Sequence, residues 1–366
     1  MTTTTAAVLR TGDGPFTIEE LTVGDPRPDE VTVRLVAAGM CHTDLLAREM
    51  PPEMFTGARV YGHEGAGVVE AVGSAVDHVV PGDHVVLSFA WCGECPACLR
   101  GRHPYCFRFA AYNTDGGRPD GSTAFTDAAG EPVASHYFGQ SSFAGLTVAN
   151  GKSVVKVDPA YDLTRLGPLG CGFQTGAGTV FNTLGVEPGA SFVVAGAGAL
   201  GLSAIMAAKV AEAGEIIAID RHPSRLELAE RYGATQVING TPEDITAGII
   251  KATGTGADYA FDTTGVGPLV RAMVNGLNPI GTCALAGVGF GELVLDHLSL
   301  ISGRSVIGVM EGDAVTAEFI PRLAALDAAG EMPLHELITP FPLDRINEAE
   351  AASADGSVIK PVLIFP

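Results

Sequence analysis

The sequence has few charged residues, and basic residues are the scarcer kind. Only 17% of its 366 residues are charged whereas 46% are hydrophobic. This excludes a disordered chain, which needs low hydrophobicity and high charge. Lysine and arginine number 22 against 42 aspartates and glutamates, which gives a formal net charge of −20. Because such a surface repels phosphate backbones and anionic lipid, we expect neither nucleic acid nor a membrane as a partner.

The N-terminus lacks the basic segment and apolar run of a signal peptide. The cysteines number seven, and this odd count argues against a secreted disulfide scaffold. It favours metal-binding or catalytic thiols in a reducing compartment, so we expect a cytoplasmic protein. Two uncharged stretches, 166–186 and 188–208, reach membrane-spanning length. Their many glycines, with prolines and polar side chains, favour buried segments of a globular fold instead.

The length suits about two domains, because single hydrophobic cores stop growing near about 250–300 residues. The first part has short β-type runs between turns, which predicts a mostly β domain. Its predicted strands are 31–37, 67–72 and 84–89. From about residue 190, strands alternate with helices, which predicts a parallel, doubly wound α/β sheet. The predicted strands there are 191–195, 215–220, 236–238, 259–262, 282–286 and 305–309.

The predicted helices follow turn and cap signals. One runs from the glycine-rich turn after residue 195 to about 213, and another spans 224–232, with Ser224 as its N-cap and Gly233 past its end. The tail adds a helix at 318–329 and a final strand at 361–365.

A glycine-rich turn connects the strand at 191–195 to the next helix. Gly196, Gly198 and Gly201 have the spacing of a dinucleotide-binding fingerprint, with Leu200 in the same turn. Asp220 ends the next predicted strand, where a carboxylate accepts from both ribose hydroxyls and repels a 2′-phosphate. We therefore expect NAD rather than NADP, although the neighbouring Arg221 could soften this preference. The alternative is a glycine-rich turn that binds nothing.

A short lobe carries four cysteines, Cys92, Cys95, Cys98 and Cys106. Four thiolates this close together can close a tetrahedral zinc site without an open position, which predicts a structural role. Disulfides and an iron–sulfur cluster are the alternatives, but the last gap is longer than in ferredoxin-like spacing and lacks the following proline.

Three dispersed residues, Cys41, His63 and Cys171, are weak signals when taken singly. A buried cysteine is usually a small hydrophobe, and a lone histidine is more often a satisfied polar group than a ligand. Together they offer two thiolates and one imidazole, which is a known catalytic zinc set with a fourth position for substrate.

With these residues in place, the chain resembles the zinc-dependent medium-chain alcohol dehydrogenases over nearly its whole length. Within that family it is most similar to bacterial aryl-alcohol (benzyl alcohol) dehydrogenases. The segments that carry this similarity are 39–45, 82–88, 140–144 and 166–172. The resemblance implies a GroES-like catalytic domain from residues 1–172 and 313–366, with the zinc lobe at 92–106. It implies a Rossmann NAD-binding domain at 173–312.

The resemblance also implies roles at the catalytic centre. Cys41, His63 and Cys171 would hold one zinc ion, and the four-cysteine lobe a second. Asp44 would orient the ring of His63, Glu64 would lie behind the metal, and Thr43 would take the proton from the alcohol. In liver-type members a histidine three residues after this threonine passes the proton to solvent, and Leu46 stands at that position here.

The implied cofactor contacts are distributed along the chain. His42 and Lys360 would approach the pyrophosphate, Thr175 the nicotinamide end and Arg225 the adenosine ribose. Relatives are tetramers or dimers, so the resemblance implies a homo-oligomer joined through the Rossmann sheets.

We interpret four apolar residues as a pocket for an aromatic substrate, namely Leu46, Met54, Phe89 and Trp91. Plain core packing explains each of them equally well. The predicted function is NAD-dependent oxidation of a benzyl-type primary alcohol to its aldehyde, and the reverse reaction. Allylic terpene alcohols such as geraniol are the alternative substrates. Glutathione-dependent formaldehyde oxidation fits less well, since it needs an entrance that receives anions.

Two other classes of protein share single features with this sequence. A zinc-ribbon binding module could contain the four-cysteine lobe, but the lobe is not strongly basic and the chain is acidic. A zinc-free quinone reductase of the same superfamily would lack Cys41, His63 and the lobe.

Overall fold

A computed structural model describes residues 2–48, 55–289 and 291–366, which form two compact units. Unit 1 comprises Met1–Cys171, Val315–Ala329 and Pro333–Pro366, and unit 2 comprises Gly172–Ala314 and Gly330–Met332. The sequence-based division at 172/173 and 312/313 differs from the main borders by one and two residues.

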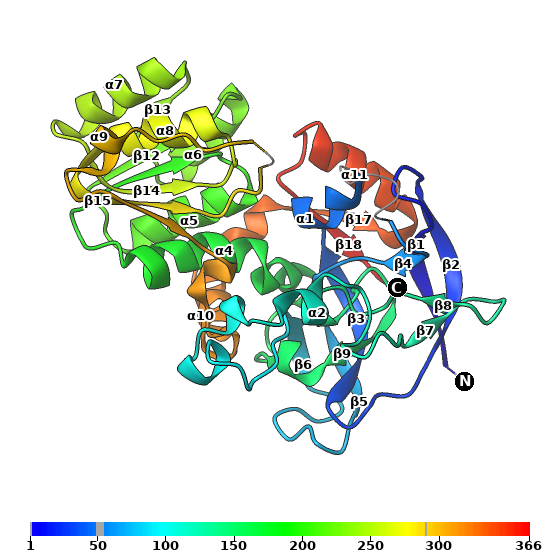
Figure 1. Cartoon of the computed structure of the whole chain (residues 1–366). Helices are drawn as coiled ribbons and strands as arrows, with labels where there is room; N and C mark the ends of the chain where they lie inside the picture. Colours follow the sequence, from blue (N-terminus) through cyan, green and yellow to red (C-terminus); the bar gives the residue numbers. More distant parts are fainter. Residues whose placement is uncertain (1, 49–54, 290) are drawn as a thin grey trace. The chain divides into compact units, whose positions relative to one another are not determined.

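Unit 1 is built on two β-sheets (Figure 1). The first has the order β4 (Arg59–Val60), β1 (Thr2–Leu9), β2 (Phe16–Val23), β7 (Phe125–Thr126) and β8 (Pro132–Val133). The second has the order β10 (Val154–Lys156), β6 (His84–Leu87), β5 (Glu64–Val72), β3 (Glu30–Gly39), β18 (Lys360–Ile364) and β17 (Ile338–Pro342), with β9 (Leu146–Asn150) also paired to β3. Apolar side chains from both sheets form the core of the unit.

The helices of unit 1 are mostly short. They are α1 (His42–Leu45), α2 (Phe109–Asn113), α3 (Leu163–Leu166), α10 (Thr316–Ala328) and α11 (Ile346–Ala354). Helical turns also occur at η1 (Leu46–Arg48), η5 (Tyr137–Gly139) and η7 (Gly167–Gly170). The three predicted strands are confirmed as β3, β5 and β6, and the final strand as β18, which pairs antiparallel with β3. The strands β1 and β2 were not predicted.

Unit 2 contains a six-stranded parallel sheet with the doubly wound order β13-β12-β11-β14-β15-β16. The strands are β11 (Ser191–Ala195), β12 (Glu215–Ile219), β13 (Gln236–Ile238), β14 (Ala257–Asp262), β15 (Leu277–Leu285) and β16 (Ser305–Gly308). The helices are α4 (Gly172–Gly178), α5 (Ala199–Val210), α6 (Pro223–Tyr232), α7 (Pro242–Thr253), α8 (Gly267–Asn275) and α9 (His297–Leu300). Helices α7 and α8 lie on one side of the sheet and α5 on the other (Figure 1). This confirms the predicted Rossmann architecture.

The start of α6 differs from the prediction. Its N-cap is His222 and its first residue is Pro223, so Ser224 lies inside the helix and the predicted cap is wrong. Proline suits this place because its fixed φ is already helical and its missing N–H would have no helical partner. The predicted end is confirmed, since Gly233 follows the helix with a φ of 133°.

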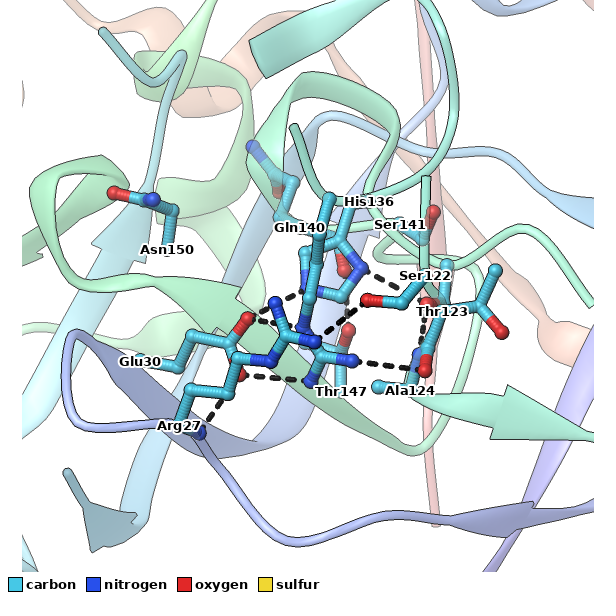
Figure 2. A network of polar contacts seen from close by, with 12 residues as sticks. Arg27, Glu30, Ser122, Thr123, Ala124, His136, Gln140, Ser141, Thr147 and Asn150 are labelled. Atoms are coloured by element: carbon cyan, nitrogen blue, oxygen red, sulfur yellow. Dashed lines mark hydrogen bonds and ion pairs between the residues drawn. The ribbon is translucent and has the colours of Figure 1, made fainter. Parts of the chain in front are cut away.

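A buried ion cluster ties together three distant segments of unit 1 (Figure 2). Arg118 donates to Glu30 through Nε at 2.6 Å and Nη2 at 2.8 Å, and His136 Nε2 lies 3.2 Å from Glu30 Oε1. Burial opposes ionisation of Glu30, but hydrogen bonds from Arg118 and His136 lower its pKa to about 2. Burial lowers the pKa of His136, so its ring is neutral near pH 7. The cluster fixes the chain just before Tyr137, which contacts the site described next.

Within the described part of the chain, no helix is both long and apolar enough to cross a membrane.

Candidate metal and cofactor sites

Three segments of unit 1 bring a cluster of potential metal ligands together. Cys41 follows β3, His63 precedes β5, Glu64 begins β5 and Cys171 follows η7. Their ligand atoms all lie within 4.8 Å of one another, and all four residues are buried. The strands β3 and β5 pair Gly39 with Glu64, which brings the dispersed cysteine and histidine to one place. Sheet pairing therefore brings Cys41 and His63 together, and Cys171 reaches them from the end of the turn η7.

The ring of His63 is oriented by Asp44. Its Nδ1 lies 2.7 Å from Asp44 Oδ1, and because a carboxylate only accepts, Nδ1 carries the proton. The same carboxylate accepts from the backbone N–H of Cys41 at 2.9 Å and of Gly62 at 3.0 Å. Asp44 thus holds both ligand segments, as an outer partner of a metal-binding histidine does.

The other ring nitrogen of His63 fits a metal ion. Its Nε2 is buried and has no hydrogen-bond partner among the described residues. A lone pair in such a place costs free energy unless it binds a ligand. A hydrogen bond with Cys171 is the main cause that lowers the pKa of Cys41 well below the usual value, although burial opposes it. Two thiolates and one imidazole are the ligands that zinc prefers at an open, catalytic site.

Lys360 has partners that the sequence did not predict. Its Nζ donates to both carboxylate oxygens of Glu64 at 2.9 Å and to the carbonyl oxygen of Met40 at 3.2 Å. Only 2% of the residue is exposed. Lys360 thus neutralises Glu64 beside the zinc ligands. Its expected contact with the pyrophosphate stays a prediction.

Aromatic residues that the sequence analysis missed surround His63. The ring of Phe138 stacks on the imidazole at 4.5 Å and 30°, and Tyr137 meets it edge-on at 5.7 Å. The Tyr137 hydroxyl donates to the carbonyl oxygen of Thr43 at 2.9 Å. Gln140 donates to the carbonyl oxygens of His63 and Ser88, both at 2.9 Å. The segment 137–140 is far away in sequence, and only Gln140 belongs to a stretch, 140–144, whose similarity to relatives hinted at a role.

Thr43 and His42 lie in the short helix α1. The hydroxyl oxygen of Thr43 is 3.8 Å from the sulfur of Cys41, so it stands beside the ligand cluster. Thr43 is half-buried, and His42 is exposed. Both positions fit the predicted roles, which stay predictions.

The four-cysteine lobe forms a second cluster. The sulfur atoms of Cys92, Cys95, Cys98 and Cys106 lie within 4.8 Å of one another. Cys92 and Cys98 are 3.8 Å apart, far more than the roughly 2 Å of a disulfide, and all four are free thiols. Backbone N–H groups donate to these sulfurs at 3.4 Å, from Cys92, Cys95, Phe107 and Arg108. Four such sulfurs fit a closed structural zinc site.

The residues of the predicted substrate pocket differ in their burial, and for Leu46 and Trp91 the pocket role stays a prediction. Phe89 is 1% exposed and packs between Trp91 and Phe109, so it is a core residue and its prediction as a pocket residue is wrong. Trp91 is half-buried with its ring stacked on His103 of the lobe. Leu46 is half-buried, and Met54 lies outside the described residues.

The glycine-rich turn of unit 2 has the geometry of a phosphate-binding turn. Gly196 has a φ of 89°, which favours glycine. A Cβ on Gly201 would lie 1.8 Å from the carbonyl oxygen of Gly196, so only glycine fits there. The turn leads into α5, with Gly198 as its N-cap and Leu200, half-buried, in its first turn. The backbone N–H groups of this twelve-residue helix can bind a phosphate.

The predicted contacts with the nucleotide lie near this turn. Asp220 follows β12, and its carboxylate accepts from the N–H groups of Ala197 and His222, both at 2.8 Å. Each carboxylate oxygen retains a lone pair for a ribose hydroxyl. A Cβ built on Gly198 would be 3.3 Å from Arg225 Nη1, so this cation stands over the turn. Thr175 is buried in α4.

Comparison with known proteins gives the same family for both units. The family model of the alcohol dehydrogenase GroES-like domain matches residues 27–159, and the model of zinc-binding dehydrogenases matches residues 199–326. A geraniol dehydrogenase of Castellaniella defragrans is 41% identical, over 98% of this chain and 97% of the relative.

Solved structures of related proteins have the same fold over the whole length of this chain. An alcohol dehydrogenase zinc-binding domain protein from Burkholderia ambifaria is 45% identical with a TM-score of 0.97, and the match covers 100% of this chain and 99% of the other. The benzyl alcohol dehydrogenase of Acinetobacter calcoaceticus is 39% identical with a TM-score of 0.95, and all of both chains is covered.

Proposed function

Since the chain belongs to the zinc-dependent alcohol dehydrogenases of the medium-chain family, we propose that it oxidises a benzyl-type primary alcohol to the aldehyde, reversibly. The observation that carries this proposal is the buried cluster of Cys41, His63 and Cys171, which offers the ligand set of an open, catalytic zinc site. The 39% identity to a benzyl alcohol dehydrogenase, over all of both chains, favours an aryl substrate.

The residues of unit 1 prepare the reacting centre. When bound, zinc supplies a Lewis acid that acidifies an alcohol hydroxyl, and NAD supplies the hydride acceptor. Asp44 holds the proton on Nδ1 of His63 and so keeps Nε2 free to coordinate. Glu64 and Lys360 form a buried ion pair beside the thiolates, which keeps the carboxylate charge balanced there.

Thr43 is the proposed first acceptor of the hydroxyl proton. Its side chain stands beside Cys41, and the bond from Tyr137 to its carbonyl oxygen fixes its backbone. Leu46 is apolar and cannot carry the proton onward. With NAD bound, its nicotinamide ribose and water would offer the proton an exit, and the overall products would be an aldehyde, NADH and one proton.

Geraniol-type allylic alcohols are the second candidate. The 41% identity to a geraniol dehydrogenase favours them as much as the 39% identity to a benzyl alcohol dehydrogenase favours aryl alcohols. Both kinds of substrate carry a flat π-system next to the carbinol carbon.

A panel of substrates tests this proposal. Initial rates of NAD reduction are measured with benzyl, cinnamyl and ethyl alcohol and with geraniol, and are repeated with NADP. We expect kcat/KM for benzyl alcohol to exceed that for ethanol by at least about tenfold, the usual scale of pocket discrimination. Equal values would refute an aromatic-accepting site, and a higher value for geraniol than for benzyl alcohol would select the second candidate.

The proposal includes a homo-oligomer, a tetramer or a dimer, in a reducing cytoplasmic compartment. Unit 2 exposes large apolar side chains, among them Ile280 at 82% and Leu298 and Ile301 at 76% each. Such side chains are often covered by another subunit. All seven cysteines are free thiols, as a reducing compartment keeps them. Light scattering after size-exclusion chromatography gives the subunit number, and a monomer would contradict this part.

A further inference from the structure

Phe138 has an unusual backbone for an aromatic residue. Its φ of 51° and ψ of 37° lie in the left-handed region, which L-residues with bulky side chains seldom adopt. Strain of this kind persists only where surrounding contacts hold it, and it often marks a functional position. Here the strained residue is buried and lays its ring on the imidazole of His63.

Contacts independent of any metal hold this segment in place. The ion cluster of Glu30 and Arg118 anchors His136, two residues before Phe138. Figure 2 shows His136 beside Glu30. On the other side, the hydroxyl of Ser141 accepts from the N–H of Tyr137 at 2.9 Å and donates to the carbonyl oxygen of Val60 at 2.6 Å. The ring of Phe138 is therefore a support for His63 that exists before metal binding.

Phe109 connects this support to the four-cysteine lobe. Its ring meets Phe138 edge-on at 5.9 Å and 84°, and it also packs against the cluster of Cys92, Cys98 and Cys106. Its N–H donates to the carbonyl oxygen of Cys106 at 2.9 Å, so the start of α2 follows the position of that ligand.

The lobe is tied to the same rings at its other end. Trp91 precedes the first ligand, stacks on His103 at 4.3 Å and 6°, and lies 5.6 Å from Phe89. Phe89 in turn lies 6.3 Å from Phe109. Asn113 at the end of α2 exchanges hydrogen bonds with Ala90, both at 2.9 Å. A continuous series of ring contacts thus runs from the lobe to His63.

We propose that Phe109 is a positioning residue through which the four-cysteine lobe sets the orientation of the catalytic histidine, by way of Phe138. The lobe then stabilises the fold and also shapes the catalytic zinc site. This inference rests on the assignment of His63 as a zinc ligand. If Phe109 only fills space, its loss lowers stability and leaves the two metal sites independent.

Trp91 provides the measurement, because it is the only tryptophan in the chain. The catalytic zinc is removed with a chelator until one zinc per chain remains and activity is lost, and Zn²⁺ is then titrated back while tryptophan emission is recorded. Zn²⁺ absorbs no visible or near-ultraviolet light, so a change in emission reports a change around Trp91. Coupling between sites is reciprocal, so filling the catalytic site must act on the lobe.

The matched variants are Phe109→Leu and Phe125→Leu. Both lose one ring from the core of unit 1, but Phe125, fully buried in β7, is outside the series of ring contacts. We expect wild type and Phe125→Leu to change their emission up to one added zinc, and Phe109→Leu to bind zinc without that change. For Phe109→Leu, kcat/KM should fall by about two- to tenfold through kcat, the scale of one aromatic pair, with KM for NAD unchanged.

Each outcome decides the proposal. Emission of the wild type that stays constant while zinc rebinds would overturn the coupling and leave the zinc site intact. An equal emission change in Phe109→Leu would assign the coupling to other residues. Failure of zinc to rebind at all would refute the zinc site itself. If Phe109→Leu does not fold, Phe109→Tyr retains the ring and should keep the wild-type response, and the wild-type titration alone still decides.

Discussion

The two thiol clusters of unit 1 are built in opposite ways. The lobe collects Cys92, Cys95, Cys98 and Cys106 from one short stretch, and backbone N–H groups of that stretch donate to the sulfurs. The catalytic cluster collects Cys41, His63 and Cys171 from three distant segments. Its orientation depends on side chains that are themselves anchored elsewhere, namely Asp44, Gln140 and Phe138.

This difference teaches what each site requires. Four thiolates fill the coordination of zinc and leave no position for a substrate, so a local loop suffices. An open site must hold three ligands in a fixed geometry while the fourth position changes, which needs support from a rigid scaffold. Changes at the first cluster should therefore act mainly on stability, with a smaller effect on catalysis through Phe109, and changes at the second mainly on catalysis.

Removal of a catalytic ligand should have the largest effect on activity, and it tests the difference between the two clusters most severely. We expect Cys41→Ala to lower kcat by at least about 10³-fold, because the lost Lewis acid supplies several kcal/mol. The protein should stay folded, bind NAD and retain one zinc per chain. Cys283→Ala is the matched control, since Cys283 is fully buried in the sheet of unit 2. A Cys41→Ala variant with near-normal turnover would show that Cys41 is not a ligand of a catalytic zinc.

A milder change at the same site is Asp44→Asn. The neutral amide no longer enforces a proton on Nδ1 of His63, so we expect zinc affinity or kcat to fall by about 10- to 100-fold. Competition with a chelator measures the affinity, and initial rates measure kcat. Wild-type values for both would show that the hydrogen bond from His63 to Asp44 does not orient the ligand.

At the lobe, Cys98→Ala should give the opposite pattern. Loss of one ligand releases the closed zinc and its contribution to folding. A loss of about 3 kcal/mol would lower the melting temperature by about 4 °C if all 366 residues unfold together, and by about 6–12 °C if unit 1 unfolds by itself. Differential scanning calorimetry checks this, and kcat should fall by no more than about tenfold. An equally heat-resistant variant counts against a structural site.

The buried ion cluster of Glu30, Arg118 and His136 should make the stability of unit 1 depend on pH. The pKa of Glu30 is about 2 in the folded state, below its ordinary value of 4.5. Ionised Glu30 therefore adds to the free energy of unfolding above about pH 4.5, and this contribution is lost as the pH falls towards 2. The full contribution is about 3 kcal/mol, of which about 2 kcal/mol disappear between pH 6 and pH 3. Glu30→Gln should remove this part of the acid sensitivity.

Urea unfolding at pH 6 and pH 3 measures this effect, with Glu348→Gln as the control. Glu348 forms an exposed ion pair with Arg345, which contributes little. If wild type and Glu30→Gln lose the same stability on acidification, the cluster is not the source.

The lobe and the Rossmann sheet could be predicted from local patterns. Cysteine spacing identified the lobe, and glycines between a strand and a helix identified the nucleotide turn. Strands β1 and β2 escaped because their threonine-rich, alternating pattern depends on sheet pairing for its meaning. Phe89 was misjudged because a hydrophobic residue next to a motif can equally be core.

The supports of the catalytic site could not be predicted for a related reason. The contact between Phe138 and His63, and the pairing of Lys360 with Glu64, join residues far apart in sequence. Neither the types of these residues nor their spacing in the sequence predicts the contacts. The pairing of Lys360 with Glu64 follows from the register of β5 and β18 on either side of β3, whereas Phe138 reaches His63 from the turn η5.

The zinc content of the purified protein tests the account most directly. Elemental analysis should find two zinc atoms per chain, one in the lobe and one at Cys41, His63 and Cys171. A fully active protein with a single zinc per chain, or with none, would contradict the assignment of two sites with separate roles.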